Sequence, residues 1–187
     1  MNYALKKGAF MKIYSARHGQ TDFNKENKIL GTTDIPLNDT GISQAEIFAE
    51  NVRHLGDVDI IISSPMIRAK TTAEFAAEKC GLKIITDERL REWNYGEYEG
   101  KPRSETFAAD KELFAVRMGK TGESLLQLAH RVYSFLDDII KNYSDKNILV
   151  VSHGGVCRMI ETYFNDMTTA EYSNWFMGNC QIIEYDI

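Results

Sequence analysis

The stretch IYSARHGQTDFNKENK, Ile13 to Lys28, begins as a short apolar run and ends in polar residues. Arg17 and His18 stand side by side directly after the apolar run, and a glycine follows them. The hydrogen-bonding residues Gln20 and Thr21 come next. A buried strand ends in turn residues, and it has no structural use for two potential cations at its tip. We therefore expect a small anion to bind there.

The chain of 187 residues is long enough to bury most of its apolar surface in a single core, so one domain is the simplest expectation. Its composition, 43% hydrophobic and 26% charged, is that of a globular protein, and no low-complexity tract or internal repeat is visible, which disfavours disorder and repeat architectures. A second methionine, Met11, stands just before the first strand-like run. We interpret residues 1–10 as an N-terminal extension, too short for a secretory signal, and residues 11–187 as the domain.

The charge balance limits the kinds of partner. Twenty-two basic and 27 acidic side chains give a formal charge of −5, which disfavours nucleic acid, so we expect any anion that the chain binds to be small and held by a local pocket. No apolar run approaches the roughly 18 residues that a membrane span requires. The three cysteines form no CxxC pair, which is typical of free thiols in a reducing cytoplasm. Cys157 follows His153 by four positions, but this pair lacks the further ligands of a zinc site.

Strand-like and helix-like patterns alternate along the chain, which predicts an α/β fold, a three-layer α/β/α sandwich around a mainly parallel sheet. The SSP triplet at residues 63–65 predicts a helix that has Ser64 as N-cap and Pro65 in the first turn and that ends at Gly81. The sequence TTAE at residues 168–171 predicts a capping box that begins at Thr168 or one residue later. The expected strands are Met11–Ala16, Val58–Ser63, Lys83–Thr86, Asn147–Ser152 and Asn179–Tyr185. The expected long helices are Gly41–Leu55, Pro65–Cys80 and Glu123–Tyr143.

Cationic and ionisable side chains follow three of these strands. Arg17 and His18 come after the first strand, Arg68 one turn into the helix after the second, and His153 after a later one. The carboxyl ends of parallel strands meet at one edge of a sheet, where ligands gather. Arginines offer forked donors that match phosphate oxygens, and a histidine can act as a nucleophile near neutral pH. We expect Arg17 to bind the anion and His18 to attack it.

Six sequence blocks occur in an order that resembles a known family. They read ARHGQTDFN, LGTTDIPLNDTG, SSPMIRAKTTAE, LREWNYGEYEG, GES and SHGG, and they extend from Met11 to the last strand. The chain resembles the histidine phosphatase superfamily, in its phosphoglycerate-mutase-like branch. The resemblance implies that His18 is transiently phosphorylated and that Arg17, Arg68 and His153 hold the phosphoryl group. It implies no metal and no other cofactor.

The resemblance also assigns the remaining site residues. Glu92 falls where the family places its proton donor, and Glu97 and Glu99 are rivals for that role. Cationic neighbours should lower the pKa of His18 and keep its ring neutral. A segment at about residues 97–122 is expected to cover the pocket and to set specificity. The residues expected to contact substrate are Asn24, Gln20, Thr21, Gly31, Tyr95, Arg103 and Gly154.

Both phosphatases and mutases occur in this family. His153 lies only 61 positions after Glu92, and no Arg-Arg pair is present, whereas the resemblance implies a longer segment with such a pair in mutases. We therefore expect a phosphomonoesterase that hydrolyses a small metabolite. Two features keep a cofactor-dependent phosphoglycerate mutase open, the NKENKILGTTD block and Arg103, which occupies the place of a mutase substrate-binding lysine.

Two further hypotheses come from different classes of protein. A non-catalytic phospholigand binder would not need His18, His153 and Glu92 together. Phosphatases of protein phosphohistidine in this family tend to be shorter and to lack the segment after Glu92. As for self-association, an edge strand of the predicted sheet offers a surface for a homodimer.

Overall fold

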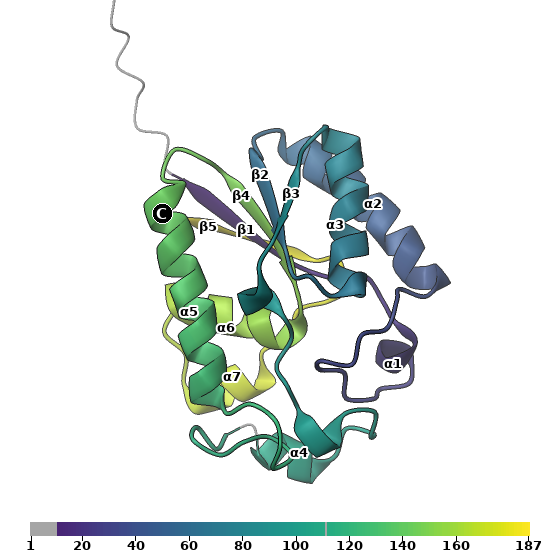
Figure 1. Cartoon of the computed structure of the whole chain (residues 1–187), viewed down its shortest axis with the longest axis vertical. Helices are drawn as coiled ribbons and strands as arrows, with labels where there is room; N and C mark the ends of the chain where they lie inside the picture. The colour runs from purple at the N-terminus through teal and green to yellow at the C-terminus, as the bar shows by residue number, and fades with distance from the viewer. Residues whose placement is uncertain (1–10, 111) are drawn as a thin grey trace, which may run out of the picture.

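The computed structural model describes residues 11–110 and 112–187, without the side chains of residues 105–107 (Figure 1). The N-terminal extension expected at residues 1–10 lies outside the described residues. The strands are β1 (Lys12–Arg17), β2 (Ile60–Ser63), β3 (Ile84–Thr86), β4 (Ile148–Ser152) and β5 (Ile182–Asp186). The helices are α1 (Asp22–Lys25), α2 (Asp39–Leu55), α3 (Ile67–Cys80), α4 (Glu105–Asp110), α5 (Leu125–Asn142), α6 (Gly154–Phe164) and α7 (Thr169–Asn174), with short 3₁₀ turns η1 (Glu88–Leu90) and η2 (Gly96–Tyr98).

The five strands form one sheet in the order β3-β2-β4-β1-β5. Strands β1 to β4 pair in parallel, and β5 runs antiparallel to β1 at one edge. Arg17 pairs with Ser152, and Ser63 pairs with Val151, so β1, β4 and β2 end at the same edge of the sheet. This register brings the residues that follow these strands together.

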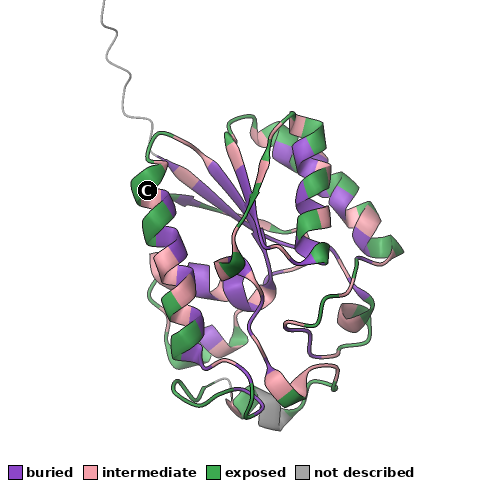
Figure 2. Cartoon of the chain, in the orientation of Figure 1, coloured by how far each residue is buried: buried purple, intermediate pink, exposed green. Residues whose placement is uncertain are grey.

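Alternating side chains of the sheet enter two separate apolar clusters, because successive residues of a strand point to opposite faces. In β4, Ile148 and Val150 belong to the cluster beneath α5 and α6, whereas Leu149 and Val151 belong to the cluster beneath α2 and α3. Figure 2 shows the buried residues along the strands and on the inner sides of these helices. The predicted three-layer sandwich with a mainly parallel sheet is confirmed.

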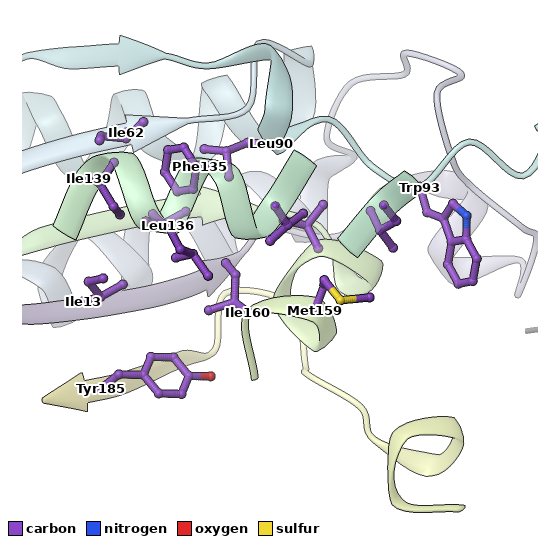
Figure 3. Packing of buried hydrophobic residues seen from close by; sticks show 14 of the residues in the cluster. Ile13, Ile62, Leu90, Trp93, Phe135, Leu136, Ile139, Met159, Ile160 and Tyr185 are labelled. Atoms are coloured by element: carbon purple, nitrogen blue, oxygen red, sulfur yellow. The ribbon is translucent and has the colours of Figure 1, made fainter. Parts of the chain in front are cut away.

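Helix α5 supplies much of one cluster. Figure 3 shows Phe135, Leu136 and Ile139 packed with Ile13 of the sheet and Ile160 of α6. Full burial of one such side chain contributes about 1.5–3 kcal/mol, so this helix is firmly anchored. No helix within residues 11–110 or 112–187 is long and apolar enough to cross a membrane.

The start of α3 differs from the sequence prediction. The helix begins at Ile67 with Met66 as N-cap, so the predicted N-cap role of Ser64 is wrong. Ser64 Oγ instead accepts from Met66 N at 3.3 Å and lies 2.8 Å from His153 Nε2. The contact with His153, which follows the neighbouring strand β4, therefore gives Ser64 a role other than the predicted N-cap. At its other end α3 stops at Gly81, as predicted, in a left-handed conformation.

Candidate active site

His18 lies directly after β1, and its backbone is held on both sides. Its N–H donates to Ser152 O at 3.0 Å, and its carbonyl accepts from Asn179 Nδ2 at 2.8 Å. His18 is 2% exposed, and its Nδ1 lies 2.6 Å from Gly19 O. A carbonyl oxygen can only accept, so Nδ1 carries the ring hydrogen. In the neutral ring the lone pair is therefore on Nε2.

Arg68 meets that lone pair. Its Nε donates to His18 Nε2 at 3.3 Å, although the side chain is completely buried. The other donors bind the backbone of the loop after α1, Nη1 to Thr33 O at 3.0 Å and Nη2 to Gly31 O at 2.8 Å. Burial lowers the pKa of Arg68 to about 10, which still leaves the guanidinium charged at neutral pH. Gly31 thus positions Arg68 through its carbonyl.

The pKa of His18 lies well below its usual value. Burial is the largest cause, and the positive charges of Arg68 and Arg17 add to it. The direction expected from the sequence is confirmed, but the neighbouring cations are secondary to the loss of water. His18 is consequently a neutral imidazole at physiological pH.

Arg17, the last residue of β1, reaches a segment near the C-terminus. Its Nη1 donates to Met177 O at 2.7 Å, and its guanidinium lies 5.4 Å from the ring centre of Phe176. Its Nε is buried and has no hydrogen-bond partner among the described residues. A Cβ added to Gly154 would lie 3.7 Å from this Nε, so Arg17 approaches the start of α6. A buried donor without a partner is rare, and an anionic ligand would satisfy it.

His153 follows β4 and is the N-cap of α6. Its ring stands 5.2 Å from that of His18 in an edge-on arrangement. Its Nε2 lies 2.8 Å from Ser64 Oγ, whereas Nδ1 is buried without a partner in the described part of the chain. Burial, followed by the charge of Arg68, lowers the pKa of His153 well below its usual value. A second unpartnered polar atom therefore lies beside the first histidine.

Glu92 is the acidic residue of the site, and it is 6% exposed. Its carboxyl oxygens accept from Trp93 N at 2.7 Å and from Gly155 N at 3.0 and 3.1 Å. The N-terminus of α6 thus binds an acidic side chain of the protein itself, in keeping with its dipole. A Cβ on Gly155 would lie 2.5 Å from Glu92 Oε1, so only glycine allows this approach.

A cavity of about 510 Å³ opens onto these groups. Among the residues expected from the sequence, Arg17, His18 and Glu92 line it, whereas Arg68 and His153 are not among its lining residues and contact His18 and Ser64, respectively. The predicted substrate-contacting residues that line it are Gln20, Asn24, Tyr95, Arg103 and Gly154. Thr21 and Gly31 do not: Thr21 is the N-cap of α1, and Gly31 holds Arg68.

Residues 13–187 match the family model of the histidine phosphatase superfamily (branch 1). The chain belongs to this superfamily. The resemblance inferred from the sequence blocks is thereby confirmed, and the protein is an enzyme of the histidine phosphatase superfamily.

Relatives of this histidine phosphatase include proteins with both activities in their names. It is 36% identical over 152 residues, 77% of this chain and 70% of the relative, to a "Probable phosphoglycerate mutase" of Yersinia pestis (strain Pestoides F). Phosphoserine phosphatase of Entamoeba histolytica, solved with 3-phosphoglyceric acid, superposes with a TM-score of 0.82 at 29% identity, over 93% of this chain and 89% of that chain. A mycobacterial glucosyl-3-phosphoglycerate phosphatase, solved with VO3, superposes with a TM-score of 0.80 at 25% identity, over 93% of this chain and 90% of that chain.

The loop that carries Glu92 in this histidine phosphatase is held by a residue that sequence reasoning missed. Arg131 of α5 donates from Nη1 to Arg89 O at 2.5 Å and to Arg91 O at 2.6 Å, and from Nη2 to Glu92 O at 3.2 Å. Glu123 pairs with the same guanidinium at 2.7 Å. Arg131 lies in a helical pattern that predicts only packing, so no local signal marks it.

The rivals for the acidic role are placed elsewhere. Glu99 accepts hydrogen bonds from the N–H groups and hydroxyls of Thr32 and Thr33, and Glu97 is exposed. Neither lines the cavity, so Glu92 is the carboxylate that reaches it among the described residues. Between residues 97 and 122 only Arg103 lines the cavity, as far as side chains are described.

The C-terminal segment Ser173–Asn179 forms a large part of the cavity wall and was not expected from the sequence. It contributes its backbone at Met177 to Arg17 and the side chain of Asn179 to the backbone of His18. Phe176 is 74% exposed beside Arg17. The capping box at Thr168 correctly predicts the start of α7, but it gives no sign of what the residues after this helix contact.

Proposed function

We propose that this enzyme is a phosphomonoesterase that hydrolyses a small phosphorylated metabolite through a phosphohistidine at His18. One observation carries the proposal: a neutral imidazole with its lone pair on Nε2 lies among buried donors that lack partners in the described part of the chain. These donors are Arg17 Nε and, with Ser64 donating to its Nε2, the Nδ1–H of His153. A phosphoryl group would satisfy both while it faces His18 Nε2. Positioning and charge stabilisation are what phosphoryl transfer requires.

In the proposed first step, the lone pair of His18 Nε2 attacks phosphorus, and the bond from phosphorus to the ester oxygen breaks. Glu92 gives its proton to the departing oxygen, which leaves as an alcohol. The Nδ1–H of His18 continues to donate to Gly19 O and stabilises the charge that develops on the ring. Arg17 and Arg68 balance the charge on the equatorial oxygens.

In the proposed second step, a water molecule attacks the phosphohistidine. Glu92, now a carboxylate, takes a proton from that water, and the bond from Nε2 to phosphorus breaks. Inorganic phosphate leaves, and His18 returns to its neutral form. The division of one displacement into two easier ones is the advantage of a covalent intermediate.

We propose that the reaction needs no metal ion, because Arg17 and Arg68 supply the positive charge beside His18. Activity should therefore survive dialysis against EDTA without loss. A strict requirement for added magnesium or zinc would contradict this part of the proposal.

A phosphoglycerate mutase is the second candidate, favoured by the name of the Yersinia pestis relative and by two cationic cavity residues, Lys28 and Arg103. A mutase must retain a bisphosphorylated intermediate and exclude water from the phosphohistidine. Arg117, a further cation of the 97–122 segment, does not line the cavity and donates to Gly122 O. We therefore favour hydrolysis.

The product ratio separates the two activities. With 3-phosphoglycerate and a trace of 2,3-bisphosphoglycerate, a mutase forms 2-phosphoglycerate much faster than inorganic phosphate. A panel of other phosphomonoesters is measured in parallel by phosphate release. We expect phosphate release from at least one monoester and little isomerisation. Rapid isomerisation without phosphate release would overturn the proposal.

A further inference from the structure

Arg158 lines the same cavity as the proposed phosphoryl site but has no part in the proposed mechanism. It lies on α6 four residues after Gly154, so the two residues share one helix face and are about 6 Å apart along the axis. Long side chains on a helix lean back toward its N-terminus. Arg158 is thus placed one turn from the groups that surround His18.

The guanidinium of Arg158 has no acidic partner among the described residues. Its Nη2 donates to Trp175 O at 2.8 Å, and it stacks 5.2 Å from the ring centre of Tyr172. Its Nε is buried without a partner in the same part of the chain. A partly buried cation that is not compensated by an anion is costly, which points to an anionic ligand.

The arrangement repeats that of Arg17. Each arginine donates to a backbone carbonyl of the same segment, Arg17 to Met177 O and Arg158 to Trp175 O, and each guanidinium packs on an aromatic ring. Each keeps a buried Nε without a partner among the described residues. The cavity wall therefore carries two similarly built guanidinium sites, of which the proposed chemistry uses one.

Two further features support a second anion. The hydroxyl of Tyr172, whose ring packs on Arg158, is buried near that guanidinium, and burial raises its pKa to about 12, so it keeps its proton at neutral pH. Among the described residues that line the cavity, Glu92 is the sole acid, whereas the cations are Arg17, Lys28, Arg103 and Arg158. The electrostatic potential inside the cavity is therefore positive and favours a ligand with more than one negative group.

We propose that Arg158 binds a second anionic group on the leaving-group side of the substrate, a carboxylate or a second phosphate, while Arg17 binds the phosphoryl group that is transferred. The inference rests on the proposed phosphatase function. If Arg158 has this role, the preferred substrates are metabolites with two anionic groups. These metabolites should be compact, because only one helical turn separates Gly154, beside the phosphoryl site, from Arg158.

Matched substrates test this preference. Glycerol 3-phosphate has a neutral leaving group, 3-phosphoglycerate adds a carboxylate to the same carbon skeleton, and propane-1,3-diol bisphosphate supplies a second phosphate. We expect the wild-type enzyme to show at least tenfold higher kcat/KM for one of the two doubly anionic compounds than for glycerol 3-phosphate. The doubly anionic compound that is preferred identifies the second anion. Equal values for all three would overturn the inference.

The variant Arg158→Met keeps most of the side-chain length and removes the charge. We expect it to lower kcat/KM for the preferred doubly anionic compound by about ten- to hundredfold, the range for a lost charged hydrogen bond. Glycerol 3-phosphate should change by less than about threefold. The matched control is Arg53→Met on the exposed face of α2, where Arg53 pairs with Glu50. Equal losses on both kinds of substrate would assign Arg158 a purely structural role and overturn the inference.

Binding measurements keep the inference testable if Arg158→Met does not fold. Calorimetry on the His18→Asn variant should then give at least tenfold tighter binding of the preferred doubly anionic compound than of glycerol 3-phosphate. Arg158→Lys, added to the His18→Asn variant, keeps the charge but loses the forked donors, and it should reduce that difference in affinity. If the two ligands bind with equal affinity both with and without Arg158→Lys, the role of Arg158 is contradicted. Failure to hydrolyse any monoester, including nitrophenyl phosphate, would instead contradict the proposed function.

Discussion

Arg68 Nε donates to His18 Nε2 at 3.3 Å, and both side chains are buried. The contact occupies the lone pair that the proposed nucleophile needs. It also orients the ring, together with the Nδ1 contact to Gly19 O. A phosphoryl group that enters the site offers Arg68 an oxygen in place of the ring nitrogen. In the proposed mechanism, Arg68 hydrogen-bonds the neutral ring of His18 before substrate binds and stabilises the transferred group afterwards.

The two buried histidines should make the fold sensitive to acid. The pKa values of His18 and His153 lie well below 6.5 in the folded protein, so the unfolded chain binds more protons as the pH falls through that value. Stability should decrease below about pH 6.5, by up to about 1.4 kcal/mol per pH unit for each histidine. Urea unfolding between pH 7.5 and 5.5 measures the slope.

The matched variants for this slope are His18→Asn and, as a control, His54→Asn on the exposed face of α2. Removing His18 should reduce the slope by up to about 1.4 kcal/mol per pH unit, whereas the control should keep the wild-type slope. Identical slopes in all three proteins would show that the buried imidazole does not govern the acid response.

Glu92→Gln tests the acid of the proposed mechanism. The substitution keeps the size of the side chain and removes the group that passes protons. Loss of kcat/KM should reach about 10²–10⁴-fold for alkyl phosphates, whose leaving groups need a proton, and should be much smaller for nitrophenyl phosphate. If both substrates lose the same factor, Glu92 is not the acid, and Glu97→Gln and Glu99→Gln become the next variants to measure.

Arg131→Gln should disturb the carboxyl group of Glu92 through the backbone of its loop. The guanidinium holds the carbonyls of three residues of the loop that carries Glu92, so its loss frees that loop and leaves Glu123 without its partner. We expect a decrease of about 1–3 kcal/mol in unfolding free energy and a preferential loss on alkyl phosphates. The control is Arg89→Gln, which removes pairs with Asp87 and Asp138.

The double variant Arg131→Gln with Glu92→Gln separates positioning from general destabilisation. If Arg131 acts through Glu92, its loss should add little to the rate on alkyl phosphates once Glu92 is already changed. Independent, additive losses in rate would show that Arg131 supports the fold alone.

The site residues at strand ends could be predicted from the sequence, whereas the residues that hold them in place could not. Arg17 ends a strand of the mainly parallel sheet, His18 and His153 directly follow strands, and topology alone brings such positions to one edge. Arg131 and the segment Ser173–Asn179 reach the site through tertiary packing, which no periodicity encodes. The capping box predicts the start of α7, but the contact of Met177 O with Arg17 joins residues 160 positions apart.

The glycine that follows His18 has a packing role that the sequence does not reveal. In the structure, a Cβ at Gly19 would lie 2.6 Å from Gly41 O, and its N–H donates to Thr72 Oγ1 at 3.0 Å. The missing side chain therefore allows α2 to approach the loop after β1. Gly155 also lacks a side chain for a packing reason, because a Cβ there would collide with the carboxyl group of Glu92.

The phosphohistidine is the central claim, and its direct detection is the most decisive measurement. The enzyme is mixed with a turned-over monoester, quenched in alkali within milliseconds and digested for mass spectrometry. We expect a phosphate on the His18 peptide that is stable in alkali and lost in acid, and none in His18→Asn, which should also lack turnover. A phosphorylated peptide elsewhere, or turnover by His18→Asn at the wild-type rate, would contradict the mechanism.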